Sequence, residues 1–426
     1  MNIAQASREE LVDMLPSLEA DYAGLKSQGL SLDLTRGKPA PEQLALSASL
    51  DGILGGDYTS ASGVDVRNYG GIDGLPEAKA LLGGLFDLSE DETLIGGNSS
   101  LQLMYLTMEL ALNMGLASHP PWRERTEVKF LCPAPGYDRH FAVCEHLGIT
   151  MITVPMTANG PDMAICEELL LHDPDICGMW CVPRFSNPTG CVYSDETVAR
   201  IAALPHKASA GFLVMWDNAY AVHALTEDAP QLASLSKACR ENGTLGQVLQ
   251  FGSTSKVTFA GAGVAFMGSS ADSVAAIKAH LGYQTIGPDK VNQLRHVRLF
   301  PDRAALSSHM RGHAALIGPK FDCVLDTLEA ELGGTGMGEW TQPQGGYFIS
   351  FDTLPGLAQD VVALAAEAGV KLTPAGATFP YGQDPNDSNI RLAPTFPALE
   401  DVRTSAEVFT LCVKIASVRQ RLATMS

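Results

Sequence analysis

One lysine stands among small hydroxyl-bearing residues, between two apolar segments of the chain. Lys256 directly follows Gly-Ser-Thr-Ser at 252–255, and apolar runs at 248–251 and 264–267 flank this turn. A lysine that is partly removed from water has a lowered pKa, and its free amine can form a Schiff base. Hydroxyl groups and free backbone N–H groups beside it can bind an anion. The stretch predicts either a Schiff-base lysine next to an anion site or, with equal weight, an exposed loop lysine among serines.

Two other polar residues follow apolar runs in the same way. Asn187 comes shortly after the apolar run 176–182, and Asp217 directly follows the run 212–216. In an open α/β sheet, ligands bind outside the carboxyl ends of the strands, so side chains from three such ends can meet at one ligand. We therefore expect Asn187, Asp217 and Lys256 to line one site. A Schiff-base lysine beside an anion site indicates pyridoxal phosphate (PLP) as the cofactor.

Four motifs stand in the order found in fold-type I PLP-dependent aminotransferases, and the chain resembles this family from about residue 32 to its end. They are N-P-T-G at 187–190, D-x-x-Y at 217–220, S-x-S-K at 253–256 and S-N-I-R-L-A at 388–393. Four motifs in one order are far more specific than any one of them. The resemblance implies an α/β PLP-transferase fold of type I. Its large domain has a mostly parallel sheet of the seven-stranded type, and its smaller domain is α+β.

The resemblance also implies a role for each motif residue. Lys256 would hold PLP as a Schiff base and later move a proton, while Asp217 would keep the pyridine nitrogen protonated. Asn187 and Tyr220 would hydrogen-bond the ring oxygen, with Asn187 also lying beside the substrate. Arg391 would bind the substrate carboxylate as a bidentate pair, and the alternative for this arginine is a surface ion pair.

Further residues are assigned to the cofactor by the same resemblance. Tyr137, after the strand expected at 128–132, would stack on the pyridine ring. The phosphate would be bound by two groups of residues: the turn before the helix expected at 101–115, and the serines before Lys256. For the turn, the alternative is a plain helix cap. These phosphate-binding residues are Asn98, Ser99, Ser100, Ser253 and Ser255.

Two further positions concern which residues complete the phosphate-binding site. Tyr69 matches a family tyrosine that touches the phosphate in the partner subunit, which implies a homodimer with shared active sites; the alternative is a buried loop tyrosine. Much of the family has a phosphate-binding arginine eight positions after the lysine, but Val264 stands there in this chain. The serines would then carry more of the phosphate binding.

The stretch around Lys256 and T-R-G-K-P at 35–39 look most like a divergent bacterial group of aspartate aminotransferases. This implies amino-group transfer between aspartate, or a related dicarboxylic amino acid, and 2-oxoglutarate. Gly37 would belong to an arm that covers the substrate, and Arg36 or Arg295 would bind the second carboxylate. The alternatives are a transaminase for neutral or aromatic amino acids, a PLP-dependent lyase, and a non-catalytic PLP-binding regulatory domain.

The elements that must position these residues follow from the hydrophobic pattern. Strands alternate with helices up to about residue 269, as a mostly parallel sheet requires, and the pattern changes after about residue 300. We therefore expect three parts: an N-terminal helix and substrate-covering arm at 1–45 that belongs to the small domain, a large PLP-binding domain at 46–300, and a small C-terminal domain at 301–426.

Composition and charge narrow the class of protein. The formal net charge is −19, which argues against nucleic acid or an anionic membrane as a partner. No long apolar stretch suggests a transmembrane helix, and Met1 to Gln5 lack the pattern of a signal peptide. Nine cysteines without framework spacing predict reduced thiols, no metal site and a cytoplasmic location.

Overall fold

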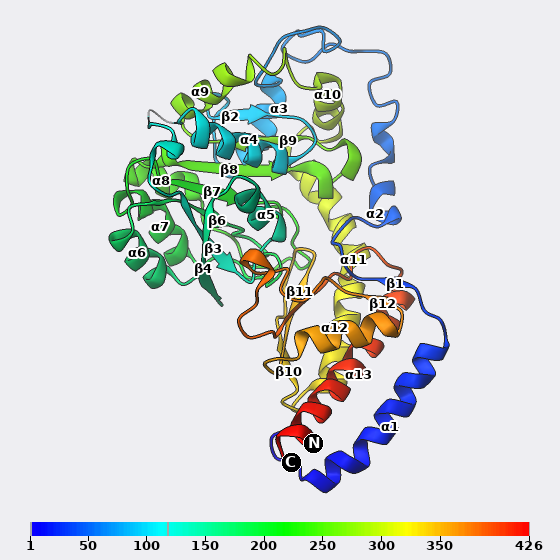
Figure 1. Cartoon of the computed structure of the whole chain (residues 1–426). Coiled ribbons are helices and arrows are strands. Elements are labelled where there is room, and N and C mark those ends of the chain that lie inside the picture. Colours follow the sequence, from blue (N-terminus) through cyan, green and yellow to red (C-terminus); the bar gives the residue numbers. More distant parts are fainter. Residues whose placement is uncertain (1, 117–118, 426) are drawn as a thin grey trace.

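The computed structural model describes residues 2–116 and 119–425, and it has a larger and a smaller lobe (Figure 1). The larger lobe is built on one sheet of eight strands in the order β2-β9-β8-β7-β6-β3-β4-β5. Its strands are β2 (Thr93–Ile95), β3 (Lys129–Ala134), β4 (Thr150–Thr157), β5 (Gly160–Pro161), β6 (Ile176–Cys181), β7 (Leu213–Asp217), β8 (Val248–Ser253) and β9 (Ala265–Gly268).

The five neighbours β8, β7, β6, β3 and β4 run parallel, whereas β9, β2 and the short β5 pair antiparallel. The predicted fold class is thereby confirmed, and β5 adds a two-residue eighth strand at the edge. Helices cover both faces: α3 (Pro76–Gly83), α4 (Ser100–Asn113), α5 (Asp138–His146), α6 (Met163–His172), α7 (Asp195–Ala203), α8 (Leu235–Asn242), α9 (Ala271–Leu281) and α10 (Lys290–Leu299).

The apolar runs of the central strands are explained by burial on both faces of the sheet. Along β7, Val214 and Trp216 pack into one apolar core, while Leu213 and Met215 pack into another. Successive side chains of a strand point to opposite faces, so a strand covered on both sides reads as a continuous apolar run. This burial fixes the register of β7 and brings Asp217 to its carboxyl end.

The smaller lobe combines helices with two small sheets. A three-stranded antiparallel sheet has the order β10-β11-β13, and β1 pairs with β12 in parallel. The elements are α1 (Arg8–Ser27), β1 (Leu32–Asp33), α2 (Pro41–Ala45), α11 (Arg303–Leu332), β10 (Gly338–Trp340), β11 (Ile349–Thr353), α12 (Ala358–Glu367), β12 (Val370–Lys371), β13 (Asn389–Leu392) and α13 (Leu399–Thr424).

The N-terminal segment packs against the C-terminal part of the chain. Helix α1 begins with a capping box between Ser7 and Glu10, and Ile3, Leu11 and Leu34 share an apolar core with residues 321–418. In Figure 1, α1 lies beside α13, and α11 runs from the smaller lobe up to the larger one. The domain boundaries expected at 45/46 and 300/301 stay a prediction. In the two described ranges, no helix combines the length and apolar character that a membrane span requires.

Candidate active site

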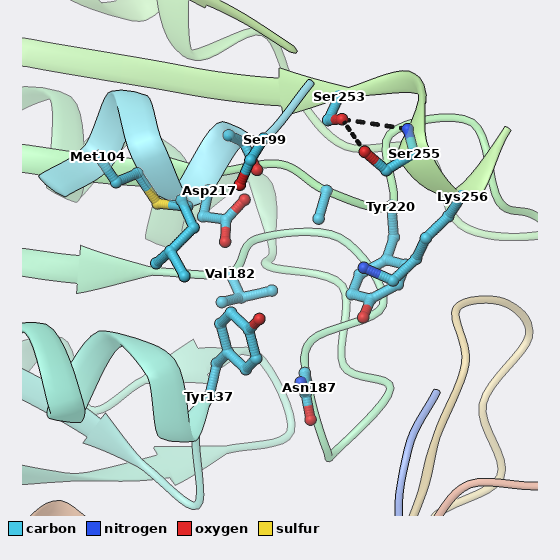
Figure 2. Close-up of a pocket in the computed structure, with 13 residues that line it drawn as sticks. Ser99, Met104, Tyr137, Val182, Asn187, Asp217, Tyr220, Ser253, Ser255 and Lys256 are labelled. Atoms are coloured by element: carbon cyan, nitrogen blue, oxygen red, sulfur yellow. Dashed lines mark hydrogen bonds between the residues drawn. The ribbon is translucent and has the colours of Figure 1, made fainter. Parts of the chain in front are cut away.

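A cavity of about 190 Å³ lies at the carboxyl ends of the central strands, and polar side chains from several elements point into it (Figure 2). Most of the residues expected at the site from the sequence are brought together here. The lining consists of Ser99, Ser100, Leu101, Met104, Tyr137, Val182, Asn187, Asp217, Ala219, Tyr220, Ser253, Ser255 and Lys256.

Lys256 ends a short 3-10 turn, Thr254–Lys256, that follows β8. Its Nζ lies 5.0 Å from the centroid of the Tyr220 ring, within the cavity (Figure 2). Burial lowers the pKa of Lys256; the negative charge of Asp217 opposes this shift, and the positive charge of Arg391 adds to it. A lysine with a lowered pKa has a larger fraction of free amine, the form that attacks a carbonyl carbon.

Hydrogen bonds from buried side chains hold the main chain at Lys256. The carbonyl of Lys256 accepts hydrogen bonds from His223 Nε2 at 3.2 Å and from the Tyr347 hydroxyl at 3.4 Å. The next carbonyl, that of Val257, accepts from His313 Nε2 at 2.9 Å. Because these donors sit in the core, the turn that carries the lysine is held in one position.

Asp217, at the end of β7, has one paired and one unpaired carboxylate oxygen. Its Oδ2 lies 3.0 Å from Nε2 of His140, which donates because a carboxylate accepts. The other oxygen, Oδ1, is buried and has no hydrogen-bond partner. The His140 ring stacks on Trp180 with 4.0 Å between centroids, which fixes its orientation. The site therefore holds a fixed carboxylate with one buried acceptor that lacks a donor.

Two tyrosines line the cavity with their hydroxyl groups protonated at neutral pH. Burial raises the pKa of Tyr220 well above its ordinary value, and burial together with Asp217 raises that of Tyr137. Tyr137 is the residue directly before α5, and Tyr220 follows β7 in the next turn. Both side chains are therefore available as hydrogen-bond donors in the cavity.

Arg391 joins the smaller lobe to the cavity. It lies on β13, and its Nη1 donates to Asn187 Oδ1 at 3.2 Å and to Asp138 Oδ1 at 3.0 Å. Because the amide oxygen of Asn187 faces the guanidinium, its Nδ2 is the group left to serve as a donor elsewhere. The ring of Phe348 covers the guanidinium at 4.9 Å from Cζ.

Serine side chains and a helix start form the opposite end of the cavity. Ser99 and Ser100 lie at the beginning of α4, where the first backbone N–H groups have no partner within the helix. Ser253 Oγ lies 2.6 Å from Ser255 Oγ (Figure 2). Ser255 Oγ also donates to the carbonyl of Asn98 at 2.9 Å. These groups can bind a dianionic phosphate without an arginine.

The segment that contains Val264 packs closely against the turn that carries Lys256. Val264 is 2 % exposed, and its N–H donates to Thr254 Oγ1 at 2.8 Å. A Cβ on the neighbouring Gly263 would lie 2.8 Å from the backbone nitrogen of Ser255, so this glycine lets the two segments pack together. Lys256 is the only cation among the lining residues that the structure describes.

Several predicted residues, Arg391 among them, lie outside the cavity lining. Tyr69 is 87 % exposed, and Arg36 is exposed on the N-terminal arm. Arg295 is half-buried on α10. Asn98 donates its side-chain amide to the carbonyl of Gly261 rather than to the cavity. Gly37 packs instead against Phe348, whose Cζ would lie 2.5 Å from a Cβ at this position.

The sequence reasoning missed His140, Asp138 and Phe348. A signal for His140 exists, because it lies three residues after Tyr137 at the start of a helix and so faces the same side. Asp138 and Phe348 belong to segments that meet only through the pairing of the two lobes. No pattern within either segment points to Arg391.

Comparison with known proteins identifies the family to which this fold and site belong. The family model described as aspartate amino-transferase matches residues 6–425, so the chain belongs to this family and is a transaminase of fold type I. An aspartate aminotransferase of Corynebacterium glutamicum is 44% identical over 402 residues, which cover 94% of this chain and 93% of that protein.

Solved structures agree with this assignment. A crystal structure of an aspartate transaminase from Corynebacterium glutamicum has a TM-score of 0.95 and 41% identity, covering 99% of both chains. An α-aminoadipate aminotransferase from Thermus thermophilus, complexed with N-(5'-phosphopyridoxyl)-L-leucine, has a TM-score of 0.74 and 22% identity, covering 99% of this chain and 96% of that one. The second likeness supports the fold alone.

Proposed function

We propose that this transaminase binds PLP at Lys256 and moves an amino group between aspartate, or a related dicarboxylic amino acid, and 2-oxoglutarate. The unpaired oxygen of Asp217 carries the proposal, because it is a buried acceptor in the same cavity as a buried lysine with a lowered pKa. A protonated pyridine nitrogen is a donor of the kind that this oxygen lacks. The residues present therefore fit the cofactor. The names of two relatives, an aspartate aminotransferase and an aspartate transaminase, support aspartate as the amino donor.

When bound, PLP supplies an electron sink for the bonds at the substrate α-carbon. The chain provides the groups that hold and protonate the reactants. Asp217 keeps a proton on the ring nitrogen through Oδ1, while His140 holds the carboxylate in place. The Nδ2 of Asn187 and the hydroxyl of Tyr220 are the donors that would hold the ring oxygen. The amine of Lys256 would be the base that takes the proton from the substrate α-carbon.

The remaining cofactor contacts are assigned in the same way. Tyr137 would pack against the ring, and the serines at the start of α4 and after β8 would hold the phosphate with the helix N–H groups. We also propose a cytoplasmic homodimer in which Tyr69 of the partner subunit completes the phosphate site. The high exposure of Tyr69 supports this, and all nine cysteines are free thiols, as a reducing compartment favours. Light scattering that finds a fully active monomer contradicts the dimer.

Arg391 binds the α-carboxylate of every substrate in this scheme, and Arg36 or Arg295 binds the distal carboxylate. One observation favours a second candidate. Lys256 is the sole cation among the described residues that line the cavity, and Arg391 adjoins it through the lining residue Asn187. Arg36 is exposed and Arg295 half-buried outside the lining, so a second carboxylate has no comparable partner. The second candidate is a transaminase for neutral or aromatic amino acids.

A screen of single amino acids tests the proposal. The PLP-loaded protein is mixed with one amino acid at a time, without an oxo acid, and the absorption of the cofactor is followed. Conversion to the amine form by aspartate supports the first candidate. Conversion by neutral or aromatic amino acids alone supports the second. No conversion by any amino acid contradicts both.

The attachment residue is tested separately. Borohydride reduction followed by peptide mapping should label Lys256, and Lys256→Ala should abolish the label. The chain offers a control in Lys290, which is 5 % exposed and whose Nζ donates to the carbonyl of Gly70. Lys290→Ala should keep the label on Lys256, and a label on any other lysine contradicts the assignment.

A further inference from the structure

The guanidinium of Arg391 is already engaged by its own chain. The side chain is 7% exposed, and Nη1 donates to both Asp138 and Asn187. The two hydrogens of Nη1 are therefore both in use. Nε is buried without a partner. A carboxylate that binds the outer edge of the fork, Nη1 with Nη2, meets the nitrogen that Asp138 and Asn187 already occupy.

A bidentate carboxylate pair needs two neighbouring N–H groups of the fork. A carboxylate that binds the outer edge must therefore take a hydrogen of Nη1 from either Asp138 or Asn187. Asn187 is 3 % exposed and sits in the buried turn after β6. Asp138 is the more exposed of the two, because 36% of its side chain is open to solvent. It is also the first residue of α5, where the helix N-terminus and water stabilise a carboxylate that has left its partner.

We propose that Asp138 is an intramolecular substitute for the substrate α-carboxylate: it occupies Arg391 in the ligand-free protein, and the substrate displaces it. The inference rests on the proposed role of Arg391 as the carboxylate-binding residue. A buried guanidinium without a counter-ion is costly, and Asp138 removes that cost when the site is empty. The substrate then exchanges one ion pair for another, so its carboxylate is bound more weakly than an unpaired Arg391 would bind it.

Weaker binding of the substrate carboxylate in the ground state costs a transaminase nothing in kcat. The carboxylate is bound equally before and during the chemical step, and such uniform binding lowers KM without raising kcat. A competing carboxylate of the chain cancels part of this binding while the guanidinium stays in place. Asp138 therefore sets the affinity for every carboxylate substrate and leaves the chemistry at Lys256 unchanged.

The test is the binding of two unreactive carboxylates, succinate and 3-phenylpropanoate, to the PLP-loaded protein by calorimetry. Asp138→Asn and Asp138→Ala should each bind both probes about tenfold more tightly than the wild type, the scale of one charge-assisted hydrogen bond. A gain in affinity cannot come from damage to the fold. Asp195→Asn is the matched control, because Asp195 is the exposed first residue of α7 and its loss changes the net charge equally. This control should bind as the wild type does.

Each other outcome is decisive. Weaker binding by Asp138→Ala with unchanged binding by Asp138→Asn means that Asp138 orients the guanidinium, and this overturns the proposal. Wild-type affinity in both variants overturns it as well. In both cases Arg391→Ala should still abolish binding, and the proposed function stands. If Arg391→Ala binds the probes like the wild type, or if no variant binds them, Arg391 is not the carboxylate site and both proposals fail.

Discussion

His140 Nε2 and Asp217 Oδ2 lie 3.0 Å apart, and this hydrogen bond leaves Asp217 Oδ1 buried and without a donor. The two oxygens of one carboxylate are thus divided between a protein partner and the cavity. His140 is itself fixed between Trp180, on which it stacks, and the edge of Tyr137. The carboxylate therefore needs no reorientation when a donor enters the cavity, which is the preorganisation that favours electrostatic catalysis.

The first prediction concerns this pair. Asp217→Asn should keep the fold but lower kcat by about a hundredfold or more, the scale of one lost electrostatic partner in an active site. An amide cannot balance the charge of a protonated ring nitrogen. Steady-state kinetics measures the loss, and the melting temperature checks the fold. Near-normal turnover in a folded variant would remove Asp217 from this role.

The second prediction follows from the lowered pKa of Lys256. In the cofactor-free protein the unfolded chain holds this proton up to the ordinary value of 10.5, whereas the folded chain releases it at lower pH. The unfolded state binds more protons in that window, so wild-type stability should rise with pH across it. Lys256→Met has no proton to lose. It should be more stable than the wild type at neutral pH, and the difference should shrink towards pH 10.5.

Urea denaturation at pH 7.5 and pH 10 measures this difference. Lys320 is the control, because it is 4 % exposed and is paired with Glu42 at 2.9 Å. Lys320→Met should be less stable than the wild type at both pH values, since it leaves the buried carbonyl of Thr395 without its donor and removes the ion pair with Glu42. A pH-independent difference for Lys256→Met would contradict the burial argument.

Local patterns predicted the parts of the site that single segments encode. The apolar runs before Asn187, Asp217 and Lys256 became β6, β7 and β8, because strands buried on both faces leave an unmistakable pattern. The motif residues then fall at the carboxyl ends by topology alone. The start of α4 at Ser100 was visible from its glycines and serines.

Contacts between distant segments could not be predicted in this way. The Arg391–Asp138 pair joins residues 253 positions apart, and the bond from Gln43 to His313 joins residues 270 positions apart. Neither residue of either pair carries a local signal for its partner, because an ion pair or a buried amide needs no particular neighbours in sequence. For the same reason, the sequence alone does not show which residue binds the distal carboxylate of the substrate.

The third prediction concerns the histidines that hydrogen-bond the main chain at Lys256 and Val257. Burial lowers the pKa of His223 to about 3 and that of His313 to about 4. Both values lie below the ordinary 6.5, so the unfolded state binds more protons between pH 6.5 and pH 4, and stability should fall as the pH falls through this range. Each imidazole contributes about 1.4 kcal/mol per pH unit. His313→Gln should therefore flatten the slope of stability against pH between 6.5 and 5.

Chemical denaturation at several pH values gives this slope, which does not depend on how much the substitution itself destabilises the fold. His172 is exposed on α6, and His172→Gln should leave the slope unchanged. A slope for His313→Gln equal to that of the wild type would show that His313 is not held neutral by burial.

The fourth prediction tests the arm. A Cβ at Gly37 would lie 2.5 Å from Cζ of Phe348, the ring that covers Arg391. Gly37→Ala should displace this ring or the arm and weaken carboxylate binding about tenfold or more for all substrates, since small misplacements at a binding group are costly. Gly24→Ala in α1, where a Cβ meets nothing within 4 Å, is the control and should leave KM unchanged. An unchanged KM in Gly37→Ala would place the arm outside the substrate site.

The last prediction concerns substrate choice. Every amino donor and oxo acid carries an α-carboxylate, so Arg391→Ala should raise KM for all of them together. A residue that binds the distal carboxylate should behave differently, because its removal leaves the second charge of aspartate unpaired, while alanine has no such charge to lose. At least one of Arg36→Ala and Arg295→Ala should therefore lower kcat/KM for aspartate about a hundredfold more than for alanine or phenylalanine. The net charge of −19 strengthens this expectation, since overall attraction cannot replace the lost contact. If neither variant changes the ratio of aspartate to neutral substrates, or if the wild type prefers neutral amino acids, the dicarboxylate assignment is wrong. The transaminase for neutral or aromatic amino acids then takes its place, with Arg391 in the same role.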